Sequence, residues 1–167
     1  MVFDSYTLGS AGVPSRIHVK QRRDAGGAAA PAYIESWRFF DELGRPIQGQ
    51  TATLAGQAVV SNTRYDAAGQ TWQSSLAYEV AGAPGSYYTP DWNQPKSETL
   101  YDSLGRATQV IQPAGTTLTS YDGWTTVATD ANLHQRAYDQ DAFGRTVQVR
   151  EYSGTGPYTL YATTSYS

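Results

Sequence analysis

The chain has 167 residues, a formal net charge of −3, no cysteine and 40% hydrophobic residues, which is the size of one ordinary domain. Without cysteine it has neither a disulfide framework nor a cysteine metal site. The weak negative charge, with no basic run beyond residues 20–23, argues against nucleic acid as a partner. No apolar run reaches the length of a membrane span, and no signal peptide is visible at the N-terminus.

The composition indicates an ordered β protein with a thin core. Leu, Ile, Val and Phe together make up about 16% of the chain, a fraction that suggests disorder only when the net charge is high. Here the charge is low, and the chain has 13 Tyr and 4 Trp, whereas disordered chains are poor in aromatic residues. We therefore expect an aromatic, Thr-rich sheet rather than a thick aliphatic core.

The predicted elements, in chain order, are short strands separated by turns. A first strand over residues 13–23 precedes a loop over residues 24–31, where Gly and Pro interrupt a run of alanines. A long irregular stretch, rich in Gly and Pro, covers residues 81–96. The other expected strands are 32–40, 45–53, 58–65, 70–80, 96–101, 106–112, 116–121, 124–129, 135–139, 145–152 and 158–166.

A short hairpin motif recurs along these strands and dictates the interpretation of the sequence. Its fullest form is an aromatic residue, Asp, two variable residues, Gly and Arg, as in residues 101–106. Asp favours the first position of a type I turn, and Gly accepts the left-handed conformation that closes a three-residue hairpin loop. The motif residues are Phe40, Asp41, Gly44, Arg45, Tyr65, Asp66, Gly69, Tyr101, Asp102, Gly105, Arg106, Tyr121, Asp122, Asp141, Gly144 and Arg145.

Polar residues also recur at fixed distances from the motif. A glutamine follows each motif glycine by four residues, and a serine precedes three of the motif aspartates by five. Because side chains alternate faces along a strand, such a column should point to one face of the sheet. We predict that these glutamines form a hydrogen-bonded row if the hairpins stack: Gln48, Gln73, Gln109 and Gln148.

The motif resembles the RHS/YD repeats, over roughly residues 33–167. This family includes the cocoon-forming subunits of bacterial insecticidal toxin complexes, the bacterial polymorphic RHS toxins and the teneurin adhesion proteins of animals. The resemblance implies a strip of antiparallel β-hairpins that forms an extended, curved sheet, a fragment of a spiral shell. The chain is too short to close such a shell, and it has no Asp-Pro-x-Gly signature of the self-cleaving core region.

The resemblance implies a structural function: the chain supplies wall to a shell that encloses a toxin or other cargo polypeptide. The expected location is secreted or at the cell surface, as part of a larger bacterial protein. We expect two parts, an N-terminal strand and flexible loop over residues 1–32 and a hairpin array over residues 33–167. Exposed strand edges need partners, so we expect further repeats, self-association through strand edges, or residues 1–32 folded over one edge.

An alternative function is an extracellular carbohydrate- or protein-binding adhesion module. Its contact residues would be Tyr87, Tyr88 and Trp92 in the long irregular stretch, since exposed aromatic rings stack on sugars or anchor a partner. The competing interpretation is that this stretch folds back and buries the three rings over an open face or edge of the sheet.

Catalysis, metal binding and cofactor binding are not expected. Asp139 and Asp141 would share one face of a strand, and paired carboxylates occur in glycosidases, but Asp141 is a turn residue of the motif. His18 and His134 have no metal-ligand spacing. The motif arginines could bind an anionic ligand as a column; pairing with nearby acids or packing on neighbouring aromatic rings is the simpler expectation.

Overall fold

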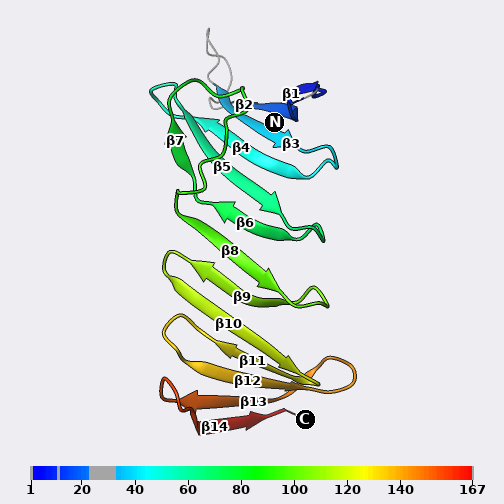
Figure 1. Cartoon of the computed structure of the whole chain (residues 1–167), viewed down its shortest axis with the longest axis vertical. Coiled ribbons are helices and arrows are strands. Elements are labelled where there is room, and N and C mark those ends of the chain that lie inside the picture. Colours follow the sequence, from blue (N-terminus) through cyan, green and yellow to red (C-terminus); the bar gives the residue numbers. More distant parts are fainter. Residues whose placement is uncertain (1, 11, 23–32, 167) are drawn as a thin grey trace. The chain divides into compact units, whose positions relative to one another are not determined.

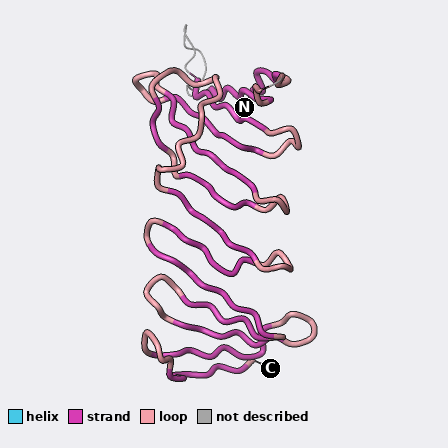
Figure 2. Tube along the Cα trace, viewed as in Figure 1, coloured by secondary structure: helices cyan, strands magenta, loops and turns pink. Residues whose placement is uncertain are grey.

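A computed structural model describes residues 2–10, 12–22 and 33–166. The described residues form strands, turns and loops with no helix, as Figure 2 shows, and all pairings between strands are antiparallel. The all-β fold of antiparallel hairpins is therefore confirmed. The chain divides into two compact units, Met1–Lys96 and Ser97–Ser167. The loop predicted over residues 24–31 lies outside the described residues.

The first unit is a sheet of neighbouring strands in chain order (Figure 1). β5 pairs with β4 along one side, and with β6 and then β7 along the other. β2 pairs with β3 along its whole length, so the N-terminal strand adds directly to the hairpin array. The strands are β1 (Val2–Thr7), β2 (Ser15–Arg22), β3 (Tyr33–Phe40), β4 (Pro46–Ala52), β5 (Ala58–Tyr65), β6 (Thr71–Ser75) and β7 (Tyr78–Val80).

Two features of this unit differ from the expected elements. β1 has no counterpart among the predicted strands, and it pairs with β2. The single strand predicted over residues 70–80 is divided into β6 and β7, because the Leu76 N–H turns away from β5 and donates to the Pro95 carbonyl at 2.8 Å. Contacts made by the returning chain thus decide where the strand breaks.

The second unit is an antiparallel meander in which each strand pairs with the next. β8 begins at the last residue of the first unit. The strands are β8 (Lys96–Tyr101), β9 (Ala107–Gln112), β10 (Gly115–Asp122), β11 (Thr125–Thr129), β12 (Gln135–Gln140), β13 (Thr146–Ser153) and β14 (Thr159–Ser165).

Polar side chains make up much of the buried interior of the first unit. Phe39, Gln48 and Asn62 lie side by side on β3, β4 and β5, and each is at most 2% exposed. Cross-strand partners share one face of a sheet, so this face also holds Gln50 and Val60. The segment after β7 runs back over its own unit (Figure 1) and covers this face. The sheet therefore buries amides where a sandwich would bury aliphatic side chains.

Candidate functional site

The motif forms the same five-residue turn in four places. In the first copy the Gly44 N–H donates to the Asp41 carbonyl at 3.0 Å, and the Asp41 N–H donates to the Arg45 carbonyl at 3.0 Å. Gly44 has a φ of 75°, a left-handed conformation that glycine adopts without steric penalty. The copies that begin at Asp66, Asp102 and Asp141 repeat both hydrogen bonds. This is the turn expected from the spacing of Asp and Gly.

The motif carboxylate holds the turn together. In the copy at Asp102, Oδ1 accepts hydrogen bonds from the Leu104 and Arg106 N–H groups at 2.9 Å, and Oδ2 accepts from Arg106 Nε at 2.8 Å. The Arg106 N–H, with the other hydrogen bonds and against the smaller effect of burial, lowers the pKa of Asp102 below its ordinary 3.8. Asp41 and Asp141 make the same contacts.

Two further turns, both predicted as turns between strands, have this geometry although their sequences are not copies of the motif. The Leu133 N–H donates to the Asp130 carbonyl at 3.0 Å and the Asp130 N–H donates to the His134 carbonyl at 2.9 Å, while Leu133 takes the glycine position with a φ of 65°. Thr53 begins the second of these turns, between β4 and β5. The Thr-x-x-Gly and Asp-x-x-x-His spacings were available signals for both.

The copy at Tyr121 and Asp122 is shorter. Asp122 pairs with Thr125 across a two-residue loop, and Gly123 has a φ of 56°. The first half of the motif therefore ends a strand here without the arginine that closes the longer turns.

Arginine from one turn stacks on the tyrosine that opens the next turn of the same unit. The Arg45 guanidinium lies 4.3 Å from the centre of the Tyr65 ring, and the Tyr65 hydroxyl donates to the Pro46 carbonyl at 2.8 Å. Such cation–π contacts contribute about 0.5–1 kcal/mol at exposed sites. The tyrosine thus contacts the preceding turn through both its ring face and its hydroxyl.

The second unit repeats this arrangement. The Arg106 guanidinium lies 4.1 Å from the centre of the Tyr121 ring, and the Tyr121 hydroxyl donates to the Ala107 carbonyl at 3.0 Å. The arginines therefore pair with the acids of their own turns and pack on neighbouring rings, which was the simpler of the two expectations. Their predicted alternative role as an anion-binding column stays a prediction.

The irregular segment is held on the first unit by a network of buried amides. Gln48 Nε2 donates to the Tyr88 carbonyl at 2.8 Å, and its Oε1 accepts from the Tyr88 N–H at 3.1 Å. Gln50 likewise donates to the Ser86 carbonyl and accepts from the Gly85 N–H. These side-chain amides pair with the segment's main chain as a neighbouring strand would, which satisfies polar groups on both sides.

The network continues along the sheet. Gln50 Nε2 donates to Gln48 Oε1 at 2.6 Å, Gln48 Nε2 donates to Asn62 Oδ1 at 2.6 Å, and Asn62 Nδ2 donates to the Tyr78 hydroxyl at 2.9 Å. A hydrogen-bonded row therefore exists, but Gln48 forms it with Gln50 and Asn62 rather than with the next motif glutamine. Gln73 instead accepts a hydrogen bond from Arg64.

The three aromatic residues predicted to bind a ligand are half-buried and engaged within the first unit. The Tyr87 ring packs at a tilt against Phe39, with 5.7 Å between ring centres. Burial, with a smaller effect of Tyr78, raises the pKa of Tyr87 above its ordinary 10.0. The Tyr88 hydroxyl donates to the Ala83 carbonyl at 2.6 Å.

Trp92 closes a stack around one arginine. The Arg64 guanidinium lies 4.1 Å from the Trp72 ring centre and 4.4 Å from that of Trp92. The segment thus folds back over its unit, as the competing interpretation holds. The ligand-binding role of these three residues stays a prediction.

The carboxylate pair considered for catalysis has separate structural partners. Asp139 Oδ1 accepts hydrogen bonds from Thr125 Oγ1 at 2.7 Å and from Arg150 at 2.6 Å. The hydrogen bond from Thr125, followed by that from Arg150, lowers the pKa of Asp139 below its ordinary 3.8. Asp141 pairs with Arg145 in its own turn. Among the described residues no group of three His, Cys, Asp or Glu side chains lies close enough to hold a metal ion.

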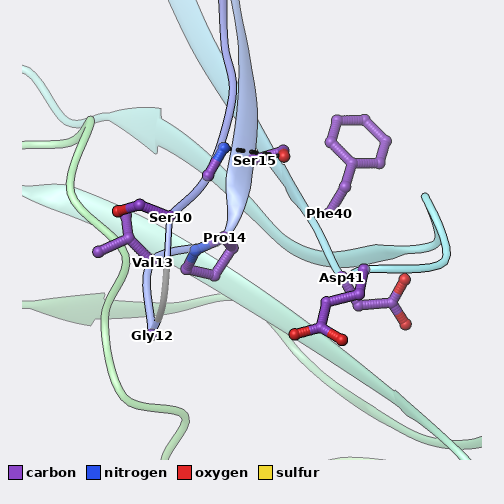
Figure 3. A pocket seen from close by; sticks show the side chains of 9 residues that line it. Ser10, Gly12, Val13, Pro14, Ser15, Phe40 and Asp41 are labelled. Carbon is purple, nitrogen blue, oxygen red and sulfur yellow. Dashed lines mark hydrogen bonds between the residues drawn. The ribbon is translucent and has the colours of Figure 1, made fainter.

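A shallow depression of about 490 Å³ lies between the N-terminal segment and the first motif turn. Figure 3 shows Val13 and Pro14 on one side and Asp41 on the other, with the Gly9 N–H donating to Ser15 Oγ. The Asp41 carboxylate is already used by the turn. The other side chains that line the depression are mixed, with Ser10, Ser15 and Glu42 beside Val13, Pro14 and Phe40.

These features define a class: a β-hairpin repeat protein whose successive turns are joined by arginine–tyrosine stacks. A family model described as Domain of unknown function (DUF6443) matches residues 16–102, which is more than half of the chain. The chain belongs to this family. No curated protein matches the sequence.

Solved structures of toxin complexes share the fold. A Photorhabdus luminescens Tc holotoxin pore with a TccC3 mutation aligns with 89% of this chain and 9% of its own, at 18% identity and a TM-score of 0.70. A TcdB2-TccC3 crystal structure aligns with 87% of this chain and 9% of its own, at 18% identity and a TM-score of 0.68. The chain therefore spans about a tenth of the length of these neighbours. The part of the chain that the structure describes has no helix long and apolar enough to cross a membrane.

Proposed function

We propose that this chain is a structural segment of an RHS/YD-repeat shell that encloses a toxin or other cargo polypeptide. The observation that carries the proposal is the fold likeness: most of the chain aligns with a short stretch of a Tc toxin chain. A segment of a repetitive wall has this relation to the whole wall, because each hairpin repeats the packing of its neighbours.

The contacts between successive turns support the same proposal. The Arg45–Tyr65 and Arg106–Tyr121 pairs each link one hairpin to the next, and the cross-strand pairing links them through the main chain. A wall that grows by such nearest-neighbour contacts needs no thick hydrophobic core. The partners are further repeats of a parent shell, and the parent protein is secreted or displayed at a bacterial cell surface.

We also propose that the chain acts without catalysis. Its most suggestive carboxylates, Asp139 and Asp141, are neutralised by Arg150 and Arg145, and a general acid needs a raised rather than a lowered pKa. Glycosidase activity that is lost in an Asp139→Asn variant of unchanged stability would contradict this.

The test is made on the parent polypeptide with the sequences that flank residues 1–167. Cryo-electron microscopy should show a hollow shell in which this chain forms part of the wall. Limited proteolysis should leave an enclosed segment intact until the shell is opened by denaturant. A parent protein that has no enclosed volume and no protected segment would overturn the proposal.

The adhesion alternative is tested separately on the chain itself. A glycan array should show no binding that depends on Trp92, since this ring already stacks on Arg64. Binding to a glycan or a cell surface that disappears in a Trp92→Ala variant, while the fold is retained, would favour the alternative.

A further inference from the structure

Arg145, the third motif arginine, closes the same turn as Arg45 and Arg106, but its side chain is more exposed. Arg145 donates from Nε to Asp141 at 2.7 Å, as Arg45 and Arg106 do with their own aspartates. Its side chain is nevertheless 74% exposed, against 32% for Arg45 and 42% for Arg106. The ion pair is common to all three, so the difference lies in the aromatic contacts: Arg45 and Arg106 lie 4.3 and 4.1 Å from a tyrosine ring centre of a neighbouring strand, whereas Arg145 lies 5.4 Å from the ring centre of Phe143 in its own turn.

The register of the sheet gives the position of the tyrosine that stacks on a motif arginine. In the two filled cases the residue three positions after the arginine is Gln48 or Gln109, and it pairs with Asn62 or Leu118. The stacking tyrosine comes three residues after that partner in each case. Side chains with the same register offset lie on the same face, so the same offset from Arg145 gives the position of a tyrosine that would stack on it.

β14 pairs with the strand after Arg145 in the same register. Gln148 stands three positions after Arg145 and pairs with Ser165, and the Tyr166 N–H donates to the Val147 carbonyl at 2.9 Å. A strand that continues β14 therefore brings the residue after Ser167 opposite Arg145. The Thr146 carbonyl occupies the position of the Pro46 and Ala107 carbonyls that accept the tyrosine hydroxyls.

We infer that Arg145 and the Thr146 carbonyl form a docking slot for a tyrosine on a strand that continues β14 into a following repeat. The ring face covers the guanidinium and the hydroxyl donates to the carbonyl. The inference rests on the proposed function, because it names the contact by which the next repeat joins this one. In the three motif turns that have an arginine, this residue would fix the register of the strand that follows.

The experiment extends the full chain directly after Ser167 with the sequence of residues 65–70, Tyr-Asp-Ala-Ala-Gly-Gln. Two matched extensions begin with Phe or Ala in place of the Tyr. The tyrosine extension should raise the unfolding midpoint by about 2–4 °C over the alanine extension, which is the shift expected from one cation–π contact in a chain of this size. The phenylalanine extension should lie between them, because it keeps the ring and lacks the hydroxyl.

An Arg145→Gln variant provides the control. In that background the differences among the three extensions should shrink, because the ring loses the guanidinium and only the hydrogen bond of the tyrosine hydroxyl to the Thr146 carbonyl is left. The NMR signal of the Arg145 Nε–H group should also move upfield only with an aromatic extension, since a ring face shields a group above it. This readout reports the contact directly and does not depend on the stability of the chain.

Equal midpoints for the tyrosine and alanine extensions, together with an unmoved Arg145 signal, would overturn the inference. If the extended chains aggregate, the filled pair gives the decision: Arg106→Gln and Tyr121→Ala should show a coupling in a double-mutant cycle, and its absence would equally overturn the inference. The shell proposal has its own test on the parent protein, so the two failures are distinguishable.

Discussion

The two units share the motif turn but differ in the exposure of the sheet face that carries the motif glutamines. In the first unit this face is covered by the segment after β7, and Gln48 is 2% exposed. In the second unit the glutamine at the same motif position, Gln109, is only half-buried, and Leu118 beside it is 46% exposed. The repeat therefore builds the sheet, whereas burial of its face depends on what else the chain supplies.

The two faces also differ in the types of side chain that they carry. The covered face of the first unit has amides that meet the main chain of the covering segment, since a buried polar group is costly unless it is hydrogen-bonded. The face of the second unit has Leu100, Ile111 and Leu118 at its surface. The covered face thus has hydrogen-bonded amides, and the other face has apolar side chains that are partly exposed.

The largest expected effect comes from removing the central amide of the covered face. Gln48→Ala should destabilise the first unit by about 2–4 kcal/mol, because it strands polar groups of Asn62, Gln50 and the Tyr88 main chain. The measurement is urea unfolding, with hydrogen exchange to assign the loss to one unit.

Gln109→Ala is the matched change in the second unit. It should alter the free energy of unfolding by no more than about 0.5 kcal/mol, as expected for a surface position. Equal losses for the two variants would contradict the view that coverage, rather than the repeat, makes the glutamine important.

A smaller effect is expected from the stack that fastens the covering segment. Trp92→Ala should cost about 2 kcal/mol, because it removes one of the two rings around the Arg64 guanidinium and uncovers a partly buried cation. Hydrogen exchange should quicken at the Gly85 and Tyr88 amides, which are held by the glutamines.

Trp124 offers the control, since it is 62% exposed in a two-residue loop of the second unit. Trp124→Ala should change the free energy of unfolding by less than about 0.5 kcal/mol. Unchanged exchange in the Trp92→Ala variant would show that the amides alone hold the segment.

The motif arginines should differ among themselves according to their stacking partners. Arg106→Gln should cost up to about 1 kcal/mol more than Arg145→Gln, because Arg106 lies 4.1 Å from the Tyr121 ring centre, whereas Arg145 lies 5.4 Å from the centre of the exposed Phe143 ring. Thermal unfolding of the two variants measures the difference. Identical costs would mean that the ion pair within the turn accounts for the whole effect of the arginine.

The smallest effect concerns pH. The Asp102 pKa is lowered in the folded state, so its contribution to stability is present above the ordinary value of 3.8 and is lost as the pH falls through the folded value. Asp102→Asn keeps an oxygen for the turn hydrogen bonds and removes the charge. The variant should therefore lose less stability than the wild type when the pH is taken below 3.8.

Acid titration of the unfolding midpoint measures this effect. Ser103→Asn, in the same turn but without a carboxylate, should follow the wild-type curve. A parallel decline for Asp102→Asn and the wild type would show that the charge of Asp102 contributes nothing to the turn.

The sequence predicts turns before β5 and before β12 but not that they have the motif geometry, and it predicts neither β1 nor the break at Leu76. The turns at Thr53 and Asp130 have the motif geometry with other residues in its fixed positions, because Thr Oγ and a left-handed Leu133 substitute for Asp and Gly. The break at Leu76 and the added strand β1 depend on chain segments distant in the sequence. The alternation of residue types in a single strand cannot predict contacts with such distant segments.

The all-β class and the four longer motif turns follow from the sequence, because each of these turns is made by hydrogen bonds among five consecutive residues and by one left-handed glycine. Only the tertiary structure decided which glutamines are buried and what the aromatic rings contact. Those outcomes need strands from successive hairpins in a particular register and a segment folded back over one face. The aspartate of the motif therefore has a local role that the sequence predicts, whereas the arginine beside it acquires its partner only when the next strand is in place.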